Sequence, residues 1–442
     1  MLVRWLLATC LLIPSLLSSC AITNNDGALV EHIVSRDDRL AQLSEQEAAR
    51  IREEEELAAQ SVKVNDPADD DLFARINQDS SWWLLHGMQG RVQRELSLMA
   101  DQAFIDKMFT EAPKYLHYIV DKVHERGMPI EIALLPGVES MFKPYAYSYA
   151  HAAGMWQIIP ATGKKLGLEI NWWHDERRDV QASTEAALDF LQSLAEKMDG
   201  DYLLALASYN AGIGRVRAAQ ERNRKKGLPT NFWALELTQQ TQRYVPRLIA
   251  LSMILRHPQR YDIKLPHLSN QPYFTEIQTR EQVDLQHFAN AIGMSMEKFS
   301  LLNPSYNQRF TSPVKQHRLL VPITRKNAAH SYVEAGNHLS KYWITHRITS
   351  GQTLSGIAAH FNTSIERLRS INKFTSSDYV KEGRYLLVPV DRESFDQFVA
   401  YHSSSPNKTS KLRSRKVVHR LRRGDSLWAL SRKYEVSLKD LL

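Results

Sequence analysis

The sequence predicts a mainly α-helical domain followed by small repeats, each built from two strands and two helices. Three observations support this division. Apolar residues recur every four positions within 179–198, which gives a helix one buried face. Strand patterns are nearly absent from Trp82 to Tyr261. Beyond Tyr261 the chain repeats a pattern of a β-type run, a turn, two short helical segments and a second β-type run.

The helical part is expected to cover residues 76–265. A second helix is predicted to begin near Pro246, because proline suits the first turn of a helix. Tyr244 would then stand just before that helix. The clearest helix, within 179–198, has its buried face at Ala182, Ala186, Phe190, Leu194 and Met198.

The repeats are aligned on a middle unit at 343–391, which has a Gly351-Gln352-Thr353-Leu354 turn and closes on a strand ending at Val388-Pro389. An offset of 69 residues places a first unit at 272–324, and an offset of 73 residues places a third at 416–442, after a linker at 392–415. The first unit lacks the glycine turn, and the third stops before its last strand. Both are therefore expected to be incomplete versions of the middle unit.

The chain has 442 residues and two cysteines, Cys10 and Cys20. No disulfide, thiolate metal site or catalytic thiol is therefore possible after Cys20. The apolar stretch before Cys20 is too short to span a bilayer of about 30 Å but has the length of the apolar region of a signal peptide. It ends in Leu17-Ser18-Ser19-Cys20, which resembles the bacterial lipoprotein box and implies an acylated Cys20 after removal of the signal peptide at 1–20. Residues 21–75, with their acidic runs, are interpreted as a spacer.

The formal charge of +7 is concentrated at the end of the chain. Residues 401–442 contain eleven Lys/Arg and three acidic residues, which leaves the preceding 400 residues close to neutral. Such a tail either faces a polyanionic surface or is a solvated charged segment. The sequence gives no reason to expect a nucleic-acid partner.

One carboxylate stands in a pattern that suits acid catalysis. Zinc patterns and a Gly-x-Ser-x-Gly elbow are absent from the sequence. Glu139 is predicted to lie where a helical run ends. Apolar surroundings disfavour its charged form, so its pKa should rise and it could protonate a leaving oxygen. These surroundings are Leu135, Val138, Met141 and Phe142.

Three further segments follow Glu139 in order. Gln157 lies after a glycine turn, and its amide can both donate to and accept from an N-acetyl group. The segment Ser208-Tyr209-Asn210 ends a helical run with an aromatic ring and an amide. Tyr244 adds a phenol before Pro246.

In this order and spacing the segments resemble the family 1 lytic transglycosylases, which have a lysozyme-like helical domain and cleave peptidoglycan. The family's Glu-Ser pair falls on Glu139-Ser140, its Gly-Leu-Met-Gln motif on Gly154-Met155-Trp156-Gln157, and its Ala-Tyr-Asn motif on Ser208-Tyr209-Asn210. The departures are Met155-Trp156 for Leu-Met and Ser208 for Ala. The resemblance implies a catalytic Glu139, no metal or other cofactor, and a set of substrate-binding residues, namely Ser140, Met155, Gln157, Tyr209, Asn210 and Tyr244.

Because the sequence offers one clear candidate for a catalytic carboxylate, the resemblance implies a particular reaction. Glu139 would protonate the bond oxygen between N-acetylmuramic acid and N-acetylglucosamine, then take the proton of the muramoyl C6 hydroxyl, leaving a 1,6-anhydromuramoyl end. Two alternatives stay open. The protein could be a wall-binding scaffold without activity, or a hydrolytic muramidase with a second carboxylate, for which the candidates are Glu131, Asp175, Glu176 and Asp179.

The repeats resemble the LysM module, a βααβ fold that binds glycans containing N-acetylglucosamine. The middle unit has the full pattern, and the implied glycan-binding residues are Gly351, Thr353, Leu354 and Asn372. The expected partners are the glycan strands of peptidoglycan and, through the lipid on Cys20, a membrane. The expected location is the outer membrane of a Gram-negative bacterium, facing the periplasm.

Overall fold

The computed structural model describes residues 70–314, 316–336, 339, 341–375 and 380–403. The predicted signal peptide with Cys20, nearly all of the spacer and the third repeat at 416–442 lie outside these residues. The chain divides into two compact units. The first contains the helical domain and the first repeat, and the second contains the middle repeat; each is described by itself.

The helical domain contains no β-strand within 70–265, apart from isolated bridges. Its mainly α character agrees with the prediction. The α-helices are α3 (Leu72–Asp79), α4 (Trp82–His86), α5 (Gly90–Met99), α6 (Gln102–Phe109), α7 (Leu116–Glu125), α8 (Leu135–Ser140), α9 (Pro160–Lys165), α10 (Val180–Glu196), α11 (Tyr202–Ala211), α12 (Ile213–Lys225) and α13 (Gln239–Arg256). Short 3-10 turns are η2 (Ala112–Lys114), η3 (Ile130–Leu134), η4 (Phe232–Ala234) and η5 (Pro258–Tyr261).

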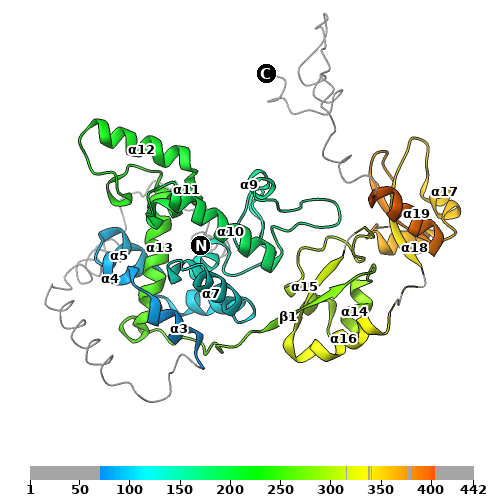
Figure 1. The fold of residues 1–442 in the computed structure, drawn as a ribbon, viewed down its shortest axis with the longest axis horizontal. Helices are drawn as coiled ribbons and strands as arrows, with labels where there is room; N and C mark the ends of the chain where they lie inside the picture. Colours follow the sequence, from blue (N-terminus) through cyan, green and yellow to red (C-terminus); the bar gives the residue numbers. More distant parts are fainter. Residues whose placement is uncertain (1–69, 315, 337–338, 340, 376–379, 404–442) are drawn as a thin grey trace, which may run out of the picture. The chain divides into compact units, whose positions relative to one another are not determined.

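Helix α13 is the central helix of this domain and packs against α4, α5 and α11 (Figure 1). It begins at Gln239, so the predicted start near Pro246 is wrong. The Thr238 side chain caps the helix by accepting from the Thr241 amide, and this satisfies a donor that would otherwise lack a partner. Pro246 lies inside the helix, where its missing N–H removes one bond of the ladder. Tyr244 therefore lies on α13 and not before it.

Helix α3 extends the helical domain into the predicted spacer. Leu72 and Phe73 are buried, and the Leu72 amide donates to the Leu268 carbonyl over 2.8 Å. Asp71 caps the helix, with its carboxylate 2.8 Å from the Phe73 amide. The spacer predicted to reach residue 75 thus ends before α3, because these apolar side chains fill the core of the domain.

The first repeat has the predicted βααβ order. Its elements are β1 (Phe274–Thr279), α14 (Leu285–Ala291), α15 (Met296–Leu302) and β2 (His317–Pro322), followed by the short η6 (Ile323–Arg325) and by α16 (Lys326–Glu334). The two strands are antiparallel, with Phe274 opposite Pro322. Phe288 and Phe299 are fully buried between the helices and the strands.

The middle repeat has the same order, β3 (Tyr342–Arg347), α17 (Leu354–His360), α18 (Ile365–Ile371) and β4 (Tyr385–Val390), with β3 and β4 antiparallel. A further helix, α19 (Arg392–Ser403), occupies the first part of the predicted linker. Its Phe395 ring lies 4.3 Å from the Tyr342 ring, centroid to centroid, and Arg392 donates to the Tyr342 hydroxyl over 2.6 Å. Residues 392–403 therefore belong to the folded repeat, because Phe395 is buried against β3.

The first repeat is attached to the helical domain by direct polar contacts within one unit. The Tyr115 hydroxyl donates to the Leu301 carbonyl over 2.7 Å, and the Asp175 amide donates to the Ser305 carbonyl over 2.9 Å. Asp179, which caps α10, accepts from the Arg318 guanidinium over 2.9 Å. The first repeat is thus built into the surface of the helical domain.

Candidate active site

Glu139 lies in the last turn of α8, at the end of a helical run as predicted. The following two residues, Met141 and Phe142, have φ angles of 54° and 55°, which reverse the chain and close the helix. The Phe142 ring then packs over Gly137, where an added Cβ would come within 2.8 Å of the ring. A glycine is therefore required at position 137 for this reversal.

The carboxyl group of Glu139 lies inside the fold, although the residue as a whole is half-buried. The Tyr244 hydroxyl donates a hydrogen bond to Glu139 Oε1. Burial raises the pKa of Glu139 to about 7, and the hydrogen bond from Tyr244 opposes this rise. Burial has the larger effect because no basic group of the described residues offsets it.

Two phenols lie beside this carboxyl group. Tyr244 reaches it from α13, and Tyr209 comes from α11. Burial and the nearby Glu139 carboxyl raise the pKa of both phenols well above the usual value. Both hydroxyls therefore remain protonated donors. Tyr209 uses its proton on the Trp156 carbonyl, at 2.8 Å.

The segment with Gln157 is a tight turn that Arg177 holds in place. Gln157 has a φ of 48°, and its amide donates to the Gly154 carbonyl over 2.8 Å. An added Cβ on Gly154 would meet the Arg177 carbonyl oxygen at 1.9 Å. The buried Arg177 guanidinium donates to the carbonyls of His151 and Ile158, on either side of the turn. No pattern in the sequence distinguishes Arg177 from its neighbour Arg178.

Ser140 ties the end of α8 to the same turn. Its hydroxyl lies 3.0 Å from the Met155 carbonyl and 3.1 Å from the Pro136 carbonyl, and it accepts from the Lys143 amide over 3.2 Å. Together with the bonds from Tyr209 to Trp156 and from Tyr244 to Glu139, this contact joins the four segments that supply the predicted site residues.

Met155 and Asn210 have structural contacts that the sequence did not predict. The Met155 side chain is only 1% exposed and belongs to the hydrophobic core, so the prediction that it contacts substrate is wrong for its side chain. Its carbonyl, which accepts from Ser140, is the part that lies at the site. Asn210 Oδ1 accepts from the Thr241 hydroxyl over 2.9 Å, which links α11 to α13.

The four acids considered as a second carboxylate have other partners. Glu131 accepts from Ser80 and from the amides at the start of α4, between 2.7 and 3.0 Å. Asp175 forms a two-pronged ion pair with Arg177, and Asp179 caps α10. Glu176 accepts from the Glu169 amide over 2.7 Å. Each of these carboxylates stabilises a turn or a helix end.

One group among the described residues has the spacing of a cation site. Ligand atoms of Glu169, His174 and Glu176 lie within 4.8 Å of one another. Asn171 and the Glu169 amide donate to these carboxylates, and burial lowers the pKa of His174. The group holds the loop before α10, and it includes none of the predicted site residues.

In the middle repeat the turn at Gly351 is exposed, and its φ of 80° requires glycine. Thr353 caps α17, and Leu354 packs partly against the core of the repeat. Asn372, also predicted to bind glycan, has hydrogen bonds within the repeat. Its amide donates to the carbonyls of Leu368 and Leu387, and its oxygen accepts from the Leu387 amide, so it joins α18 to β4.

Comparison with known proteins agrees with this arrangement. Residues 119–231 match the family described as "Transglycosylase SLT domain", residues 273–337 match "Lytic transglycosylase MltD, LysM-like domain", and residues 346–389 and 419–442 match "LysM domain". The fold and the site thus define a lytic transglycosylase with a lysozyme-like helical domain and LysM peptidoglycan-binding modules.

Similarity to curated proteins over most of the chain identifies a particular family of lytic transglycosylases. Membrane-bound lytic murein transglycosylase D of Escherichia coli strain K12 is 32% identical over 385 residues, which cover 85% of this chain and 82% of that protein. The chain belongs to this family. A putative tributyltin chloride resistance protein of an Alteromonas species is 39% identical over 161 residues, covering 36% of this chain and 76% of that protein. Within the described residues no helix has the length and apolar character needed to cross a membrane.

Proposed function

We propose that Glu139 cleaves peptidoglycan by acting first as an acid and then as a base. The observation that carries the proposal is a buried carboxyl group with a pKa of about 7 and a phenol as its hydrogen-bond partner. Such a group is partly protonated near neutral pH, so it can give a proton and later take one.

The reaction then runs in two steps. The Glu139 proton moves to the oxygen between C1 of N-acetylmuramic acid and N-acetylglucosamine, and the bond from C1 to this oxygen breaks as positive charge develops on the muramoyl ring. The Glu139 carboxylate next takes the proton of the muramoyl C6 hydroxyl, whose oxygen bonds to C1. The products are a free N-acetylglucosamine hydroxyl and a 1,6-anhydromuramoyl end, and no water is consumed.

The other assigned residues bind and orient the sugars. Tyr244 donates to Glu139, where a donor can stabilise the negative charge that develops as the proton leaves. Tyr209 donates to the Trp156 carbonyl and so holds the turn with Gln157 beside Glu139. Gln157 and Asn210 supply amides, and Ser140 fixes the end of α8 against the Gln157 turn. Met155 contributes through its backbone carbonyl.

The product of digestion tests this chemistry. Purified sacculi digested by the protein should give anhydromuramoyl ends in mass spectrometry. Glu139→Gln keeps the size of the side chain but has no proton to give, so release should fall at least roughly a hundredfold. Glu221→Gln, at an exposed acid on α12, is the matched control and should retain full activity.

Two results would contradict the proposal. Reducing ends in place of anhydro ends would mean that water attacks C1, as in a hydrolytic muramidase. Equal release by Glu139→Gln and the unmodified protein would remove Glu139 from the reaction and leave a scaffold role.

We assign the catalytic domain to residues 76–265 together with α3, and the first two LysM-type units to 272–324 and to 343–391 together with α19. In the middle unit the exposed turn with Gly351 and Thr353 supports glycan binding, which Leu354 assists from the core of the repeat. Binding of chitin oligosaccharides to the full chain should weaken in Thr353→Tyr, because a large side chain would block the turn. An unchanged affinity would place glycan binding elsewhere.

The protein is further proposed to be an outer-membrane lipoprotein that faces the periplasm, anchored through Cys20 with removal of residues 1–20. The support is the lipoprotein-box sequence before Cys20 and the absence of Asp after it. Metabolic labelling with palmitate should mark the protein and should be lost in Cys20→Ala. Label that persists in this variant would rule out Cys20 as the site of acylation.

A further inference from the structure

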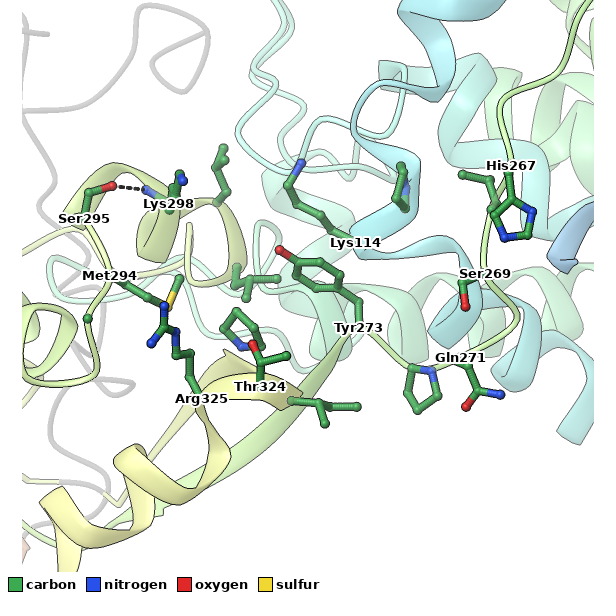
Figure 2. A pocket seen from close by; sticks show the side chains of 18 residues that line it. Lys114, His267, Ser269, Gln271, Tyr273, Met294, Ser295, Lys298, Thr324 and Arg325 are labelled. Carbon is green, nitrogen blue, oxygen red and sulfur yellow. Dashed lines mark hydrogen bonds between the residues drawn. The ribbon is translucent and has the colours of Figure 1, made fainter. Parts of the chain in front are cut away.

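A pocket of about 1150 Å³ lies where the helical domain meets the first repeat (Figure 2). Its walls come from the helical domain at Pro113-Lys114, from the connecting chain at 267–273, and from the repeat at 293–302 and 322–325. All of these segments belong to the same compact unit. Glu139, Tyr244 and the other residues of the candidate active site do not line this pocket.

The charged residues that line this pocket are all basic. Its lining includes Lys114, Lys298 and Arg325 but no aspartate or glutamate. Lys114 pairs with Glu111 over 2.8 Å, so its charge is partly neutralised. Within the part of the chain that the structure describes, no carboxylate pairs with Lys298 or Arg325, and both residues are exposed. Two cations are thus available to a ligand.

The remaining lining is largely apolar. Leu301, Leu302 and Ile323 contribute aliphatic surface, and Met294 lies beside Arg325 (Figure 2). The Tyr273 ring is 40% exposed and projects into the pocket between Lys114 and Met294 (Figure 2). A matching ligand would carry negative groups together with small apolar groups and a flat surface for the ring.

We propose that this pocket binds the peptide branches of peptidoglycan, which are short alanine-containing peptides with free carboxylates. This inference rests on the proposed function, because it takes the substrate polymer as the ligand. The carboxylates would pair with Lys298 and Arg325, the alanine methyl groups would contact the leucines, and a peptide plane would stack on Tyr273. The pocket would then hold a peptide of the wall while the separate active site holds glycan. Sugar rings alone lack the negative charge that this lining matches.

Calorimetric titration of the full chain tests the proposal. The probe is the tripeptide L-alanyl-γ-D-glutamyl-meso-diaminopimelate, added to the Glu139→Gln protein so that cleavage plays no part. We expect saturable binding that weakens at higher salt. Charge reversal in Lys298→Glu/Arg325→Glu should lower the affinity roughly tenfold or more, since both ion pairs become repulsive. Lys326→Glu, an exposed neighbour outside the lining, should leave the affinity unchanged.

Several results would overturn the proposal. Equal affinity in the double variant and its parent would place the tripeptide elsewhere, and equal affinity for a tripeptide amidated at its carboxylates would rule out ion pairing. Competition by inorganic phosphate at similar concentrations would mean an adventitious ion only. Binding to anionic phospholipid vesicles that needs Lys298 and Arg325, with no binding of tripeptide, would indicate a lipid surface. Because the titration involves no cleavage, its failure leaves the product test of Glu139 unaffected.

Discussion

Helix α13 contacts two buried carboxyl groups through neighbouring residues, and the two contacts differ in charge. Arg243 and Arg247 bind Glu95, whose side chain is 2% exposed. Tyr244 donates to Glu139. The same helix therefore contacts Glu95 through two cationic side chains and Glu139 through a neutral phenol.

This difference shows that burial alone does not decide the chemistry of a carboxyl group. Both carboxyl groups lie inside the fold, but Glu95 has two guanidinium partners that compensate a buried negative charge. Among the residues that the structure describes, Glu139 has a phenol as its partner and no cation, so burial raises its pKa to about 7. The charge of the partner separates an acid that holds the fold together from an acid that can move a proton.

The largest expected effect comes from removing the cations. Arg243→Met/Arg247→Met keeps apolar length but leaves the Glu95 carboxylate buried without a positive partner. Unfolding free energy at neutral pH should fall by about 3–5 kcal/mol in urea denaturation. The exposed pair Arg215→Met/Arg217→Met on α12 is the control and should change stability little. A loss below about 1 kcal/mol in the α13 variant would show that the two contacts do not differ as described.

A second experiment measures the cost of burying Glu139. In the folded protein this carboxyl keeps its proton up to a pKa of about 7, whereas an ordinary carboxyl loses it near 4.5. The folded protein therefore loses stability as pH rises from about 4.5 to 7, and this cost is absent from Glu139→Gln. The variant should match the unmodified protein at pH 4 and exceed it by about 3 kcal/mol at pH 8. A difference that does not change with pH would contradict the raised pKa.

A single substitution, Tyr244→Phe, tests the hydrogen bond between Tyr244 and Glu139 while keeping the aromatic ring. Tyr244→Phe removes the hydrogen bond that opposes the rise in the pKa of Glu139. Activity that depends on the protonated acid falls as pH rises through about 7, and in the variant this fall should move about one pH unit higher. The rate below pH 6 should also drop roughly tenfold, because a donor at the site is lost.

Tyr202→Phe, on the same helix as Tyr209, is the control for this pH profile of kcat/KM on isolated glycan strands. Its profile should coincide with that of the unmodified protein. A profile of Tyr244→Phe that falls at the same pH as the unmodified protein would mean that the hydrogen bond does not act on Glu139.

The smallest expected effect concerns a buried hydroxyl that has no hydrogen-bond partner among the described residues. The Ser208 hydroxyl is 0% exposed and has no hydrogen bond within the described residues. Ser208→Ala should raise the melting temperature and add about 1 kcal/mol of stability. Ser252→Ala on α13 is the matched control, because its buried hydroxyl donates to the Ile249 carbonyl over 2.8 Å and its removal should cost stability. Equal changes in stability in both variants would contradict the view that a hydrogen-bond partner determines the cost of burying a hydroxyl.

Sequence spacing predicted the fold class and the place of Glu139, but not the contacts that define its chemistry. The spacing of apolar residues indicates helices, and the order of the motifs indicates which segments contribute to the site. The hydroxyl that donates to Glu139 is determined by how α13 packs, and no local sequence pattern predicts that packing. Pro246 misled the prediction of the helix boundary because α13 is buried against α4, α5 and α11, and this tertiary packing offsets the missing hydrogen bond. The apolar faces of α3 and α19 were overlooked because each carries few buried residues.

The two described repeats share the hydrogen bonds that Asn372 forms. Asn303, its counterpart in the first repeat, donates to the Leu320 carbonyl over 2.7 Å and accepts from the Leu320 amide over 2.9 Å. The same pair of bonds joins Asn372 to Leu387. An asparagine that recurs in a unit without the glycine turn indicates a role in the fold, and this recurrence was visible in the sequence.

The hydrogen bond between Tyr244 and Glu139 joins positions 105 residues apart. A chain that is made or exported from its N-terminus presents Glu139 well before α13 follows. Until that helix packs, the Glu139 carboxyl has neither the burial that keeps its proton nor the phenol that orients it. The Glu139 carboxyl therefore acquires its raised pKa only when α13 has packed, late in the folding of the helical domain.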